Sequence, residues 1–302
     1  MKYSGIIKLL SLCSLLLIAV SGELVFAQTR ENKFGNPLEI YGEEPLLPKL
    51  DRPLSSLEKD KLRKACKDLN IQATSLLKEN KEEEAFELWY RELRLRRKLG
   101  EVEEVSALGR VGNIAWSKNR KSELQIITNR LETIEREEST KGEIDPSLLN
   151  VLAEAYQQVK ELDLALAANQ KILANARSDR AACKECNRNL EQQKKALQTI
   201  GQLSISRFDY QNAATVYQEL LAIAERENDY IYQSIYLDRL AEIYNEATQP
   251  TNALKVKLQL VERYNQEKKI RELANLKISI ANDYQLLNKP EPASQNYREA
   301  FE

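Results

Sequence analysis

A spaced pattern of small residues and tyrosine recurs along the chain, and this repeat constrains the fold more than any other feature of the sequence. In the clearest copies, a small residue is followed three places later by tyrosine and nine places after that by a second small residue. These copies are Ala153, Tyr156 and Ala165, then Ala241, Tyr244 and Ala253, then Ala281, Tyr284 and Ala293. A fixed period of this kind indicates a stack of similar supersecondary units.

Three further copies of the pattern are less regular, because the tyrosine is replaced. They are Gly201, Ser204 and Ala213, then Ala73, Leu76 and Ala85, and, weakest of all, Gly112, Ala115 and Leu124. Successive copies are separated by 39, 41, 48, 40 and 40 residues, and the 48-residue step indicates an insertion near residues 178–188. The pattern therefore predicts six repeats.

Each repeat is predicted to be a pair of antiparallel helices. Helical periodicity runs from the capping box at Ser55–Glu58 to the end of the chain, and no strand-like alternation competes with it. The two small residues let the paired helices cross closely, and the aromatic residue fills the wedge between one hairpin and the next. Pro250 and Pro290 fall at the first turn of a second helix, where the missing N–H costs nothing.

Three segments carry a resemblance to the tetratricopeptide repeat (TPR): Ile200-Gly201, Leu240–Tyr244 and Ile280–Tyr284. The resemblance covers roughly residues 57–302. It implies an all-α fold, a right-handed α-solenoid of about six TPR-like helical hairpins, and a role as a protein-interaction scaffold. The repeats are longer than the standard unit of about 34 residues, so each helix is expected to be about one turn longer than usual.

The first 27 residues have the pattern of a cleaved secretory signal peptide. Lys2 and Lys8 accompany an uncharged apolar run, Leu9–Val20, and the small-residue cleavage pattern Val25–Ala27 precedes Gln28. The apolar run is too short for a membrane-spanning helix, which needs about 20 residues. The mature protein is therefore expected to be exported to the periplasm or an equivalent extracytoplasmic compartment, or to the thylakoid lumen if the source is photosynthetic.

Residues 28–54 hold four of the eight prolines and are predicted to form an extended linker. Leu46, Leu47 and Leu50 would let this segment lie along the folded body, and a solvated tether is the alternative. Residues 55–302 then form the solenoid. Its last helix is short, which leads us to expect that the solenoid continues beyond the given C-terminus, where the final hairpin lacks a cap.

The chain contains no histidine, which excludes Ser-His-Asp and Cys-His catalytic sites, zincin helices and histidine-ligated haem. It also contains no glycine-rich phosphate-binding loop. Without the signal peptide, 43 basic and 45 acidic residues leave a net charge of −2, which gives no general attraction to nucleic acid or anionic lipid. We therefore expect no catalysis, no cofactor and no metal, with an enzyme of unrecognised chemistry as a remote alternative.

Cys183 and Cys186 lie in the insertion of the 48-residue step. Zinc needs four ligands, and only Cys66 remains to help, while a thioredoxin-type site needs a βαβ context. Two interpretations remain. An oxidising compartment favours a local disulfide between Cys183 and Cys186 that leaves Cys66 out, and a continuous helix favours two unpaired cysteines one turn apart.

Two other segments are unusual in composition. The basic segment Tyr90–Lys98 ends the second helix of the first repeat, where its charges either complement the helix dipole or form a surface for an anionic partner. Tyr230 and Tyr232 lie away from the repeat-core positions, which suits either an interface or packing against the preceding hairpin.

The resemblance also implies where a partner would bind, because the first helix of each TPR hairpin lines a concave surface. The residues at those places are Asn150, Glu154, Gln157, Gln198, Gln202, Asp238, Glu242, Asn245, Asn282 and Gln285. This lining is rich in amides, which can both donate to and accept from the backbone of an extended peptide. The alternative is that these are ordinary solvated surface positions.

The expected partner is therefore a protein or an extended peptide, with no nucleic acid and no membrane beyond the cleaved signal. Asp238 and Glu242 would favour a basic residue on the ligand. The alternative function is that of a non-catalytic regulatory or assembly subunit, which would oligomerise through an uncapped C-terminal hairpin.

Overall fold

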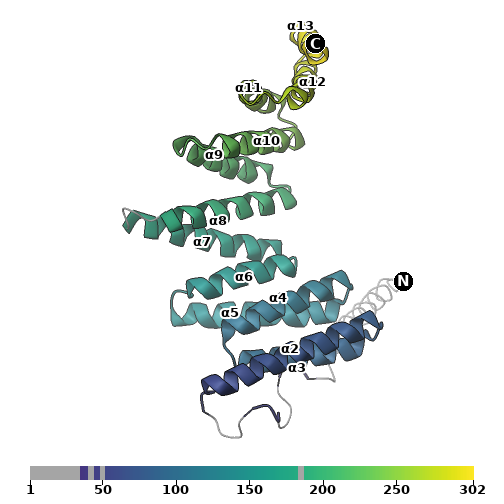
Figure 1. The fold of residues 1–302 in the computed structure, drawn as a ribbon, viewed down its shortest axis with the longest axis vertical. Helices are drawn as coiled ribbons and strands as arrows, with labels where there is room; N and C mark the ends of the chain where they lie inside the picture. Colours follow the sequence, from purple (N-terminus) through teal and green to yellow (C-terminus); the bar gives the residue numbers. More distant parts are fainter. Residues whose placement is uncertain (1–34, 40–43, 48–51, 183–186) are drawn as a thin grey trace, which may run out of the picture. The chain divides into compact units, whose positions relative to one another are not determined.

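The computed structural model describes residues 35–39, 44–47, 52–182 and 187–302, in which twelve helices and no strand are found (Figure 1). The chain divides into two compact units, unit 1 (Met1–Leu99) and unit 2 (Gly100–Glu302). Unit 1 contains α2 (Ser56–Lys78) and α3 (Glu82–Arg97). Unit 2 contains α4 (Glu101–Ser117), α5 (Lys121–Lys141), α6 (Pro146–Gln158), α7 (Leu162–Ala182), α8 (Asn187–Ser206), α9 (Tyr210–Arg226), α10 (Tyr230–Glu246), α11 (Pro250–Gln266), α12 (Ile270–Leu286) and α13 (Pro290–Phe301).

The helices form six hairpins, so the predicted architecture is confirmed. In unit 1, α2 packs against α3. In unit 2, α4 pairs with α5, α6 with α7, α8 with α9, α10 with α11 and α12 with α13, and each pair also contacts the next one along the chain. The 48-residue step is taken up by long helices on both sides of it, since α7 and α8 have 21 and 20 residues. The predicted signal peptide and the predicted Cys183–Cys186 disulfide lie outside the described residues.

Small residues lie where helices cross, as the repeat pattern predicts. Ala85, Ala165 and Ala253 are completely buried. The glycines of α4 allow a closer approach still, because a Cβ added to Gly112 would lie 2.3 Å from Val159 Cγ1, and one added to Gly109 would lie 2.9 Å from the Cα of Ala155. The least regular copy of the pattern thus contains a close crossing, between α4 and α6.

The recurring tyrosine contacts the hairpin that precedes it. Tyr156 of α6 is completely buried, and its hydroxyl donates to Glu135 Oε2 of α5 over 2.7 Å. Burial, with the neighbouring Glu135 carboxylate, raises the pKa of this phenol far above its usual value. In the same way, the hydroxyl of Tyr244 on α10 accepts from Gln218 Nε2 of α9 over 2.7 Å. A hydroxyl at this position therefore joins successive hairpins with a hydrogen bond that phenylalanine could not make.

Eight of the helices end with the same backbone turn. The second residue after each of these eight helices has a φ between 53° and 66°, and these residues are Asn80, Asn119, Lys160, Phe208, Asn228, Thr248, Lys268 and Asn288. The next N–H then bonds a carbonyl five residues back, as from Gln249 to Tyr244. This is the Schellman ending, in which asparagine is tolerated at the left-handed position. It gives the hairpins their uniform short connections.

The N-terminal segment of unit 1 lies on α3. Leu38 is 1% exposed, and an Arg94 guanidinium N–H donates to the carbonyl of Pro37 over 2.5 Å. Arg91 holds the carboxylate of Glu44 through two hydrogen bonds of 2.8 and 3.0 Å. Leu47 packs against a buried cluster formed by α2 and α3. The basic segment therefore binds the protein's own upstream chain, a role that neither interpretation of the sequence included.

The pH dependence of this contact follows from Glu44. The hydrogen bond from Arg91 is the main reason that the pKa of this carboxyl lies below its ordinary value of 4.5. A carboxyl with a depressed folded-state pKa stabilises above its unfolded pKa and loses that contribution as the pH falls through the lower value. We expect the contact to be at full strength above about pH 4.5 and to weaken progressively below it.

The methyl NMR signals of Leu38 would report this change, because Leu38 is buried only while the segment stays on α3. Glu44→Gln should reproduce the acid spectrum at neutral pH. Glu39→Gln is the matched control, since its carboxylate is half exposed and lies 3.9 Å from Arg97. If the Leu38 signals change neither in acid nor in Glu44→Gln, then the ion pair between Arg91 and Glu44 does not hold the N-terminal segment on α3.

Candidate binding face

The ten residues expected to line a binding surface all lie on the first helices of hairpins in unit 2. We call the surface formed by the exposed side chains of α6, α8, α10 and α12 the first-helix face. Seven of the ten are exposed there, namely Asn150, Glu154, Gln202, Glu242, Asn245, Asn282 and Gln285. Gln157, Gln198 and Asp238 are partly buried. The ten residues do not form one cluster. Their contacts distinguish three groups, and Gln202 is an exposed position of α8 outside them.

The residues on α6 bond within their own helix. Asn150 Nδ2 donates to the carbonyl of Pro146, and Gln157 Nε2 donates to that of Ala153. Glu154 accepts a hydrogen bond of 3.3 Å from Gln158 Nε2. These local contacts are those of ordinary helix surface positions.

The middle group surrounds tyrosines of α10 and α11. Gln198 Nε2 donates to the hydroxyl of Tyr236 over 2.9 Å, beside a small hollow of about 110 Å³ that Tyr232 and Lys194 also line. The ring of Tyr232 stacks on that of Tyr236 with centroids 5.6 Å apart. Burial raises the pKa of the Tyr236 phenol. Tyr232 therefore packs on one side and remains exposed on the other.

Asp238 is not a freely solvated acid. Its Oδ2 accepts a hydrogen bond of 2.6 Å from the hydroxyl of Tyr264 on α11, and burial raises the pKa of this carboxyl. Glu242 is exposed and pairs with Arg239 over 2.6 Å. Charge reversal at Asp238 would thus disturb the hairpin itself, whereas reversal at Glu242 changes only the surface.

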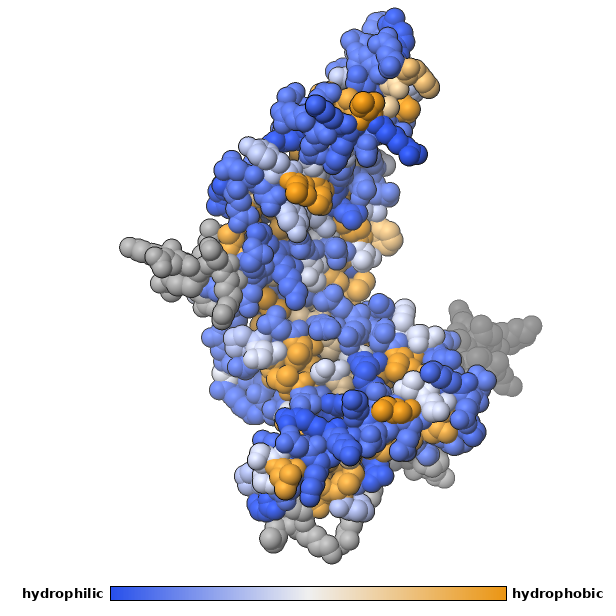
Figure 2. Space-filling view, in the orientation of Figure 1, coloured by the Kyte–Doolittle hydropathy of each residue, from blue (hydrophilic) through white to orange (hydrophobic). Residues whose placement is uncertain are grey.

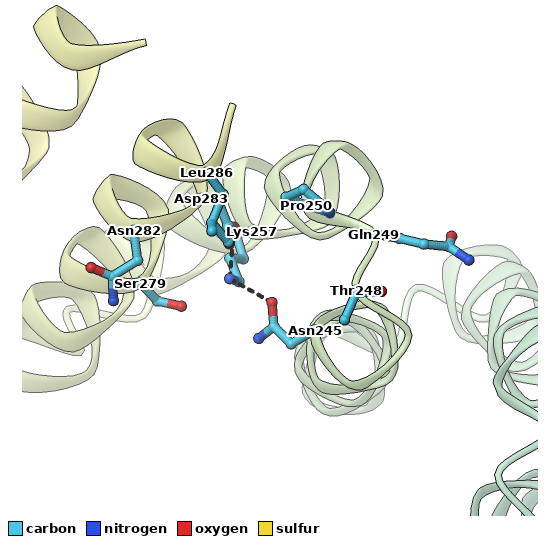
Figure 3. Close-up of a pocket in the computed structure, with 9 residues that line it drawn as sticks. All are labelled: Asn245, Thr248, Gln249, Pro250, Lys257, Ser279, Asn282, Asp283 and Leu286. Carbon is cyan, nitrogen blue, oxygen red and sulfur yellow. Dashed lines mark hydrogen bonds and ion pairs between the residues drawn. The ribbon is translucent and has the colours of Figure 1, made fainter. Parts of the chain in front are cut away.

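The third group lies around a hollow of about 480 Å³ between α10, α11 and α12 (Figure 3). Asn245 and Asn282, both predicted from the repeat, lie on opposite sides of it. The other lining residues are Thr248, Gln249, Pro250, Lys257, Ser279, Asp283 and Leu286. In Figure 3 the side chain of Gln249 points away from the others. The hollow brings two exposed amides and a serine hydroxyl to one place on the first-helix face.

A buried ion pair forms the inner wall of this hollow. Lys257 Nζ lies 2.7 Å from Asp283 Oδ2, and the two side chains are 3% and 5% exposed. Lys257 Nζ also donates to Asn245 Oδ1 over 3.0 Å. Sequence reasoning missed this pair. The available signal was a lysine at a position of α11 that helical spacing places on the buried side, with Ala253, Leu260 and Tyr264.

Two absences and one property of the surface concern the described residues. No group of three His, Cys, Asp or Glu side chains in them could hold a metal ion. None of their helices has an apolar stretch of the length needed to cross a bilayer. The face seen in Figure 2 is mostly hydrophilic, with apolar residues in small separate groups.

Paired helices, small residues at the crossings and a tyrosine between hairpins are the features of the repeat pattern, and all of them are present in the structure. The fold is a TPR-like α-solenoid. No protein-family model matches the sequence, and no curated protein matches it either.

Several solved structures are similar to the solenoid. BtubC (BKLC) from P. vanneervenii has 14% identity and a TM-score of 0.38 over 82% of this chain and 90% of that chain. A putative kinesin light chain of Podosopora anserina with nearly identical TPR-like repeats has 15% identity and a TM-score of 0.42 over 65% of this chain and 93% of that chain. A tetratricopeptide repeat protein from Parabacteroides merdae has 15% identity and a TM-score of 0.33 over 78% of this chain and 92% of that chain. Matches at this level say nothing about what the solenoid binds.

Proposed function

We propose that the protein is a non-catalytic scaffold that binds a partner protein or an extended peptide on its first-helix face. The observation that carries this proposal is the hollow between α10, α11 and α12, which the exposed amides of Asn245 and Asn282 line on opposite sides. Its volume of about 480 Å³ is within the range of small-ligand sites. Gln202 and Glu242 extend the polar surface onto α8 and α10.

The binding test compares two variants with equal charge change. Gln202→Lys with Glu242→Lys alters the first-helix face, and Gln211→Lys with Glu225→Lys alters exposed positions of α9. A partner is first isolated from an extract of the source cells on the immobilised parent protein, and then its affinity for each variant is measured. We expect at least a tenfold loss, about 1.4 kcal/mol, for the first-helix variant and no change for the α9 variant. Equal affinities would place binding elsewhere.

We also propose that the protein acts after export, which rests on the order of charged, apolar and small residues in residues 1–27. The intact mass of protein isolated from its source tests this directly. A chain that begins at Gln28 is the expected result, and a retained Met1 would contradict export.

Self-association is the second candidate function. Two large apolar side chains of the last hairpin are strongly exposed, Leu286 at 72% and Phe301 at 85%. Light scattering of the purified protein distinguishes the two candidates. A dimer that Leu286→Ser and Phe301→Ser convert to a monomer would favour an assembly role, and a monomeric parent would remove it.

A further inference from the structure

The hollow between α10 and α12 has a fixed hydrogen-bonding polarity. A lysine ammonium group can only donate, so the Asn245 atom that Lys257 Nζ contacts is the carbonyl oxygen. The amide nitrogen of Asn245 must then point the other way, as Figure 3 shows. The chain's own lysine has used the acceptor of this side chain, and its N–H donors are left for a ligand.

Asn282 has the same orientation in the structure. Its Oδ1 accepts a hydrogen bond of 2.5 Å from the hydroxyl of Tyr297 on α13, and this hydroxyl also lies 3.2 Å from Gln285 Oε1. Its amide nitrogen points to the same side of the view in Figure 3 as that of Asn245, away from Lys257. Two amides on neighbouring first helices therefore present donors, although an amide side chain could in general present either group.

The inner wall of the hollow is electrically balanced. Lys257 and Asp283 are a contact ion pair, and both are almost completely buried. The balanced pair offers no net attraction to a ligand carboxylate or to a ligand cation, so either ion would lose hydration in the hollow without a compensating charge. A neutral group with an acceptor oxygen meets neither penalty.

We propose that this hollow binds the carbonyl oxygen of a neutral amide through Asn245 Nδ2 and Asn282 Nδ2. The hydroxyl of Ser279, which lines the hollow between them, would accept the N–H of the same amide. This inference deepens the proposed function and rests on it for its biological meaning, since it names the group of a partner that the first-helix face recognises. The amide comes either from the ligand's main chain or from an asparagine or glutamine side chain.

Small probes separate these sources. Propionamide represents the side-chain carboxamide, N-methylacetamide represents the main-chain amide, and propionate has the shape of propionamide with an anionic head. Each is titrated to about 100 mM, because fragments of this size bind weakly. NMR spectra of the side-chain NH₂ groups provide the readout. We expect the Asn245 and Asn282 signals to shift with one or both amides, in a saturable way, and not with propionate.

The matched variant is Asn245→Asp with Asn282→Asp. Each substitution keeps the oxygen that Lys257 or Tyr297 needs and replaces only the outward-facing NH₂ with an acceptor. With both NH₂ groups gone, the readout is the backbone amide signals of residues 279 and 282, which should respond to the amide probes in the parent and not in this variant. Asn265→Asp with Asn275→Asp makes the same charge change at exposed positions outside the hollow and should preserve the response.

The outcomes distinguish this inference from the proposed function. The inference is overturned if the amide probes shift no signal of the hollow in the parent, if propionate shifts the same signals, or if the response survives Asn245→Asp with Asn282→Asp. These outcomes do not depend on whether the partner binds. The parent spectrum needs no variant to fold, so it decides alone if the double variant is unstable. If the amide probes bind the hollow but Gln202→Lys with Glu242→Lys leaves partner affinity unchanged, then the proposed function fails and the amide site remains.

Discussion

Asp283→Ala is expected to lower the free energy of unfolding around α11 and α12 by about 3–5 kcal/mol, because it leaves the charge of Lys257 buried without its partner. The remaining contact of Lys257, with Asn245 Oδ1, is a neutral acceptor that cannot replace a carboxylate. Native-state hydrogen exchange of the α11 and α12 amides is the suitable measurement, since a repeat protein need not unfold as one unit.

Two controls separate the buried charge from the loss of packing. Lys257→Met with Asp283→Leu removes both charges, and most of the stability should return because a buried pair is often no better than apolar residues of similar size. Glu299→Ala breaks the partly exposed pair with Lys277, and it should cost no more than about 1 kcal/mol. If Asp283→Ala costs no more than Glu299→Ala, then water must reach Lys257 and the wall of the hollow is not desolvated.

The architecture could be predicted from the sequence because it depends on local spacing. Small residues twelve places apart fix where two helices cross, and both are close in the chain. The same reasoning ranked the copy at Gly112 weakest, since it lacks the tyrosine and has Leu124 in place of the second small residue. In the structure, Gly109 and Gly112 lie so close to α6 that no side chain is needed to fill the space between α4 and α6.

The chemistry of the candidate site could be predicted only in part, because it depends on contacts between residues far apart in sequence. The pattern placed Asn245 and Asn282 on the first-helix face, but it could not tell which end of each amide was available. For Asn245 that is set by Lys257, which lies 12 residues further along the chain, and Asn282 contacts Tyr297, 15 residues further along. Asp238 was interpreted as a surface acid for the same reason, since its partner Tyr264 is 26 residues away.

The basic segment on α3 shows a second limit. Charges near a helix C-terminus usually face solvent, so composition alone gave no reason to connect Arg91 with Glu44, 47 residues earlier. The connection depends on the N-terminal segment returning to α3, where Leu38 is buried. The leucines of the segment allowed it to lie along the folded body, but a proline-rich segment carries no periodicity that names the helix it contacts.

Trp89→Ala should have the largest effect on unit 1, because Trp89 is completely buried in a small core. Its indole packs edge-on against Phe86 with ring centroids 5.2 Å apart, and Nε1 donates to Asn70 Oδ1 over 3.0 Å. Truncating a buried tryptophan costs about 3–5 kcal/mol, which is comparable with the whole stability that a small core supplies. We therefore expect α2 and α3 to lose their hydrogen-exchange protection.

The chain provides its own control for this change. Trp116, the second of two tryptophans, is 53% exposed on α4, so Trp116→Ala should cost little, and it leaves Trp89 as a single fluorophore that reports unit 1. In Trp89→Ala the amides of α6–α13 should keep their protection, because unit 2 has a core of its own. If they lose protection together with α2 and α3, the two compact units fold as one, and the loss would then measure their coupling instead of the stability of unit 1.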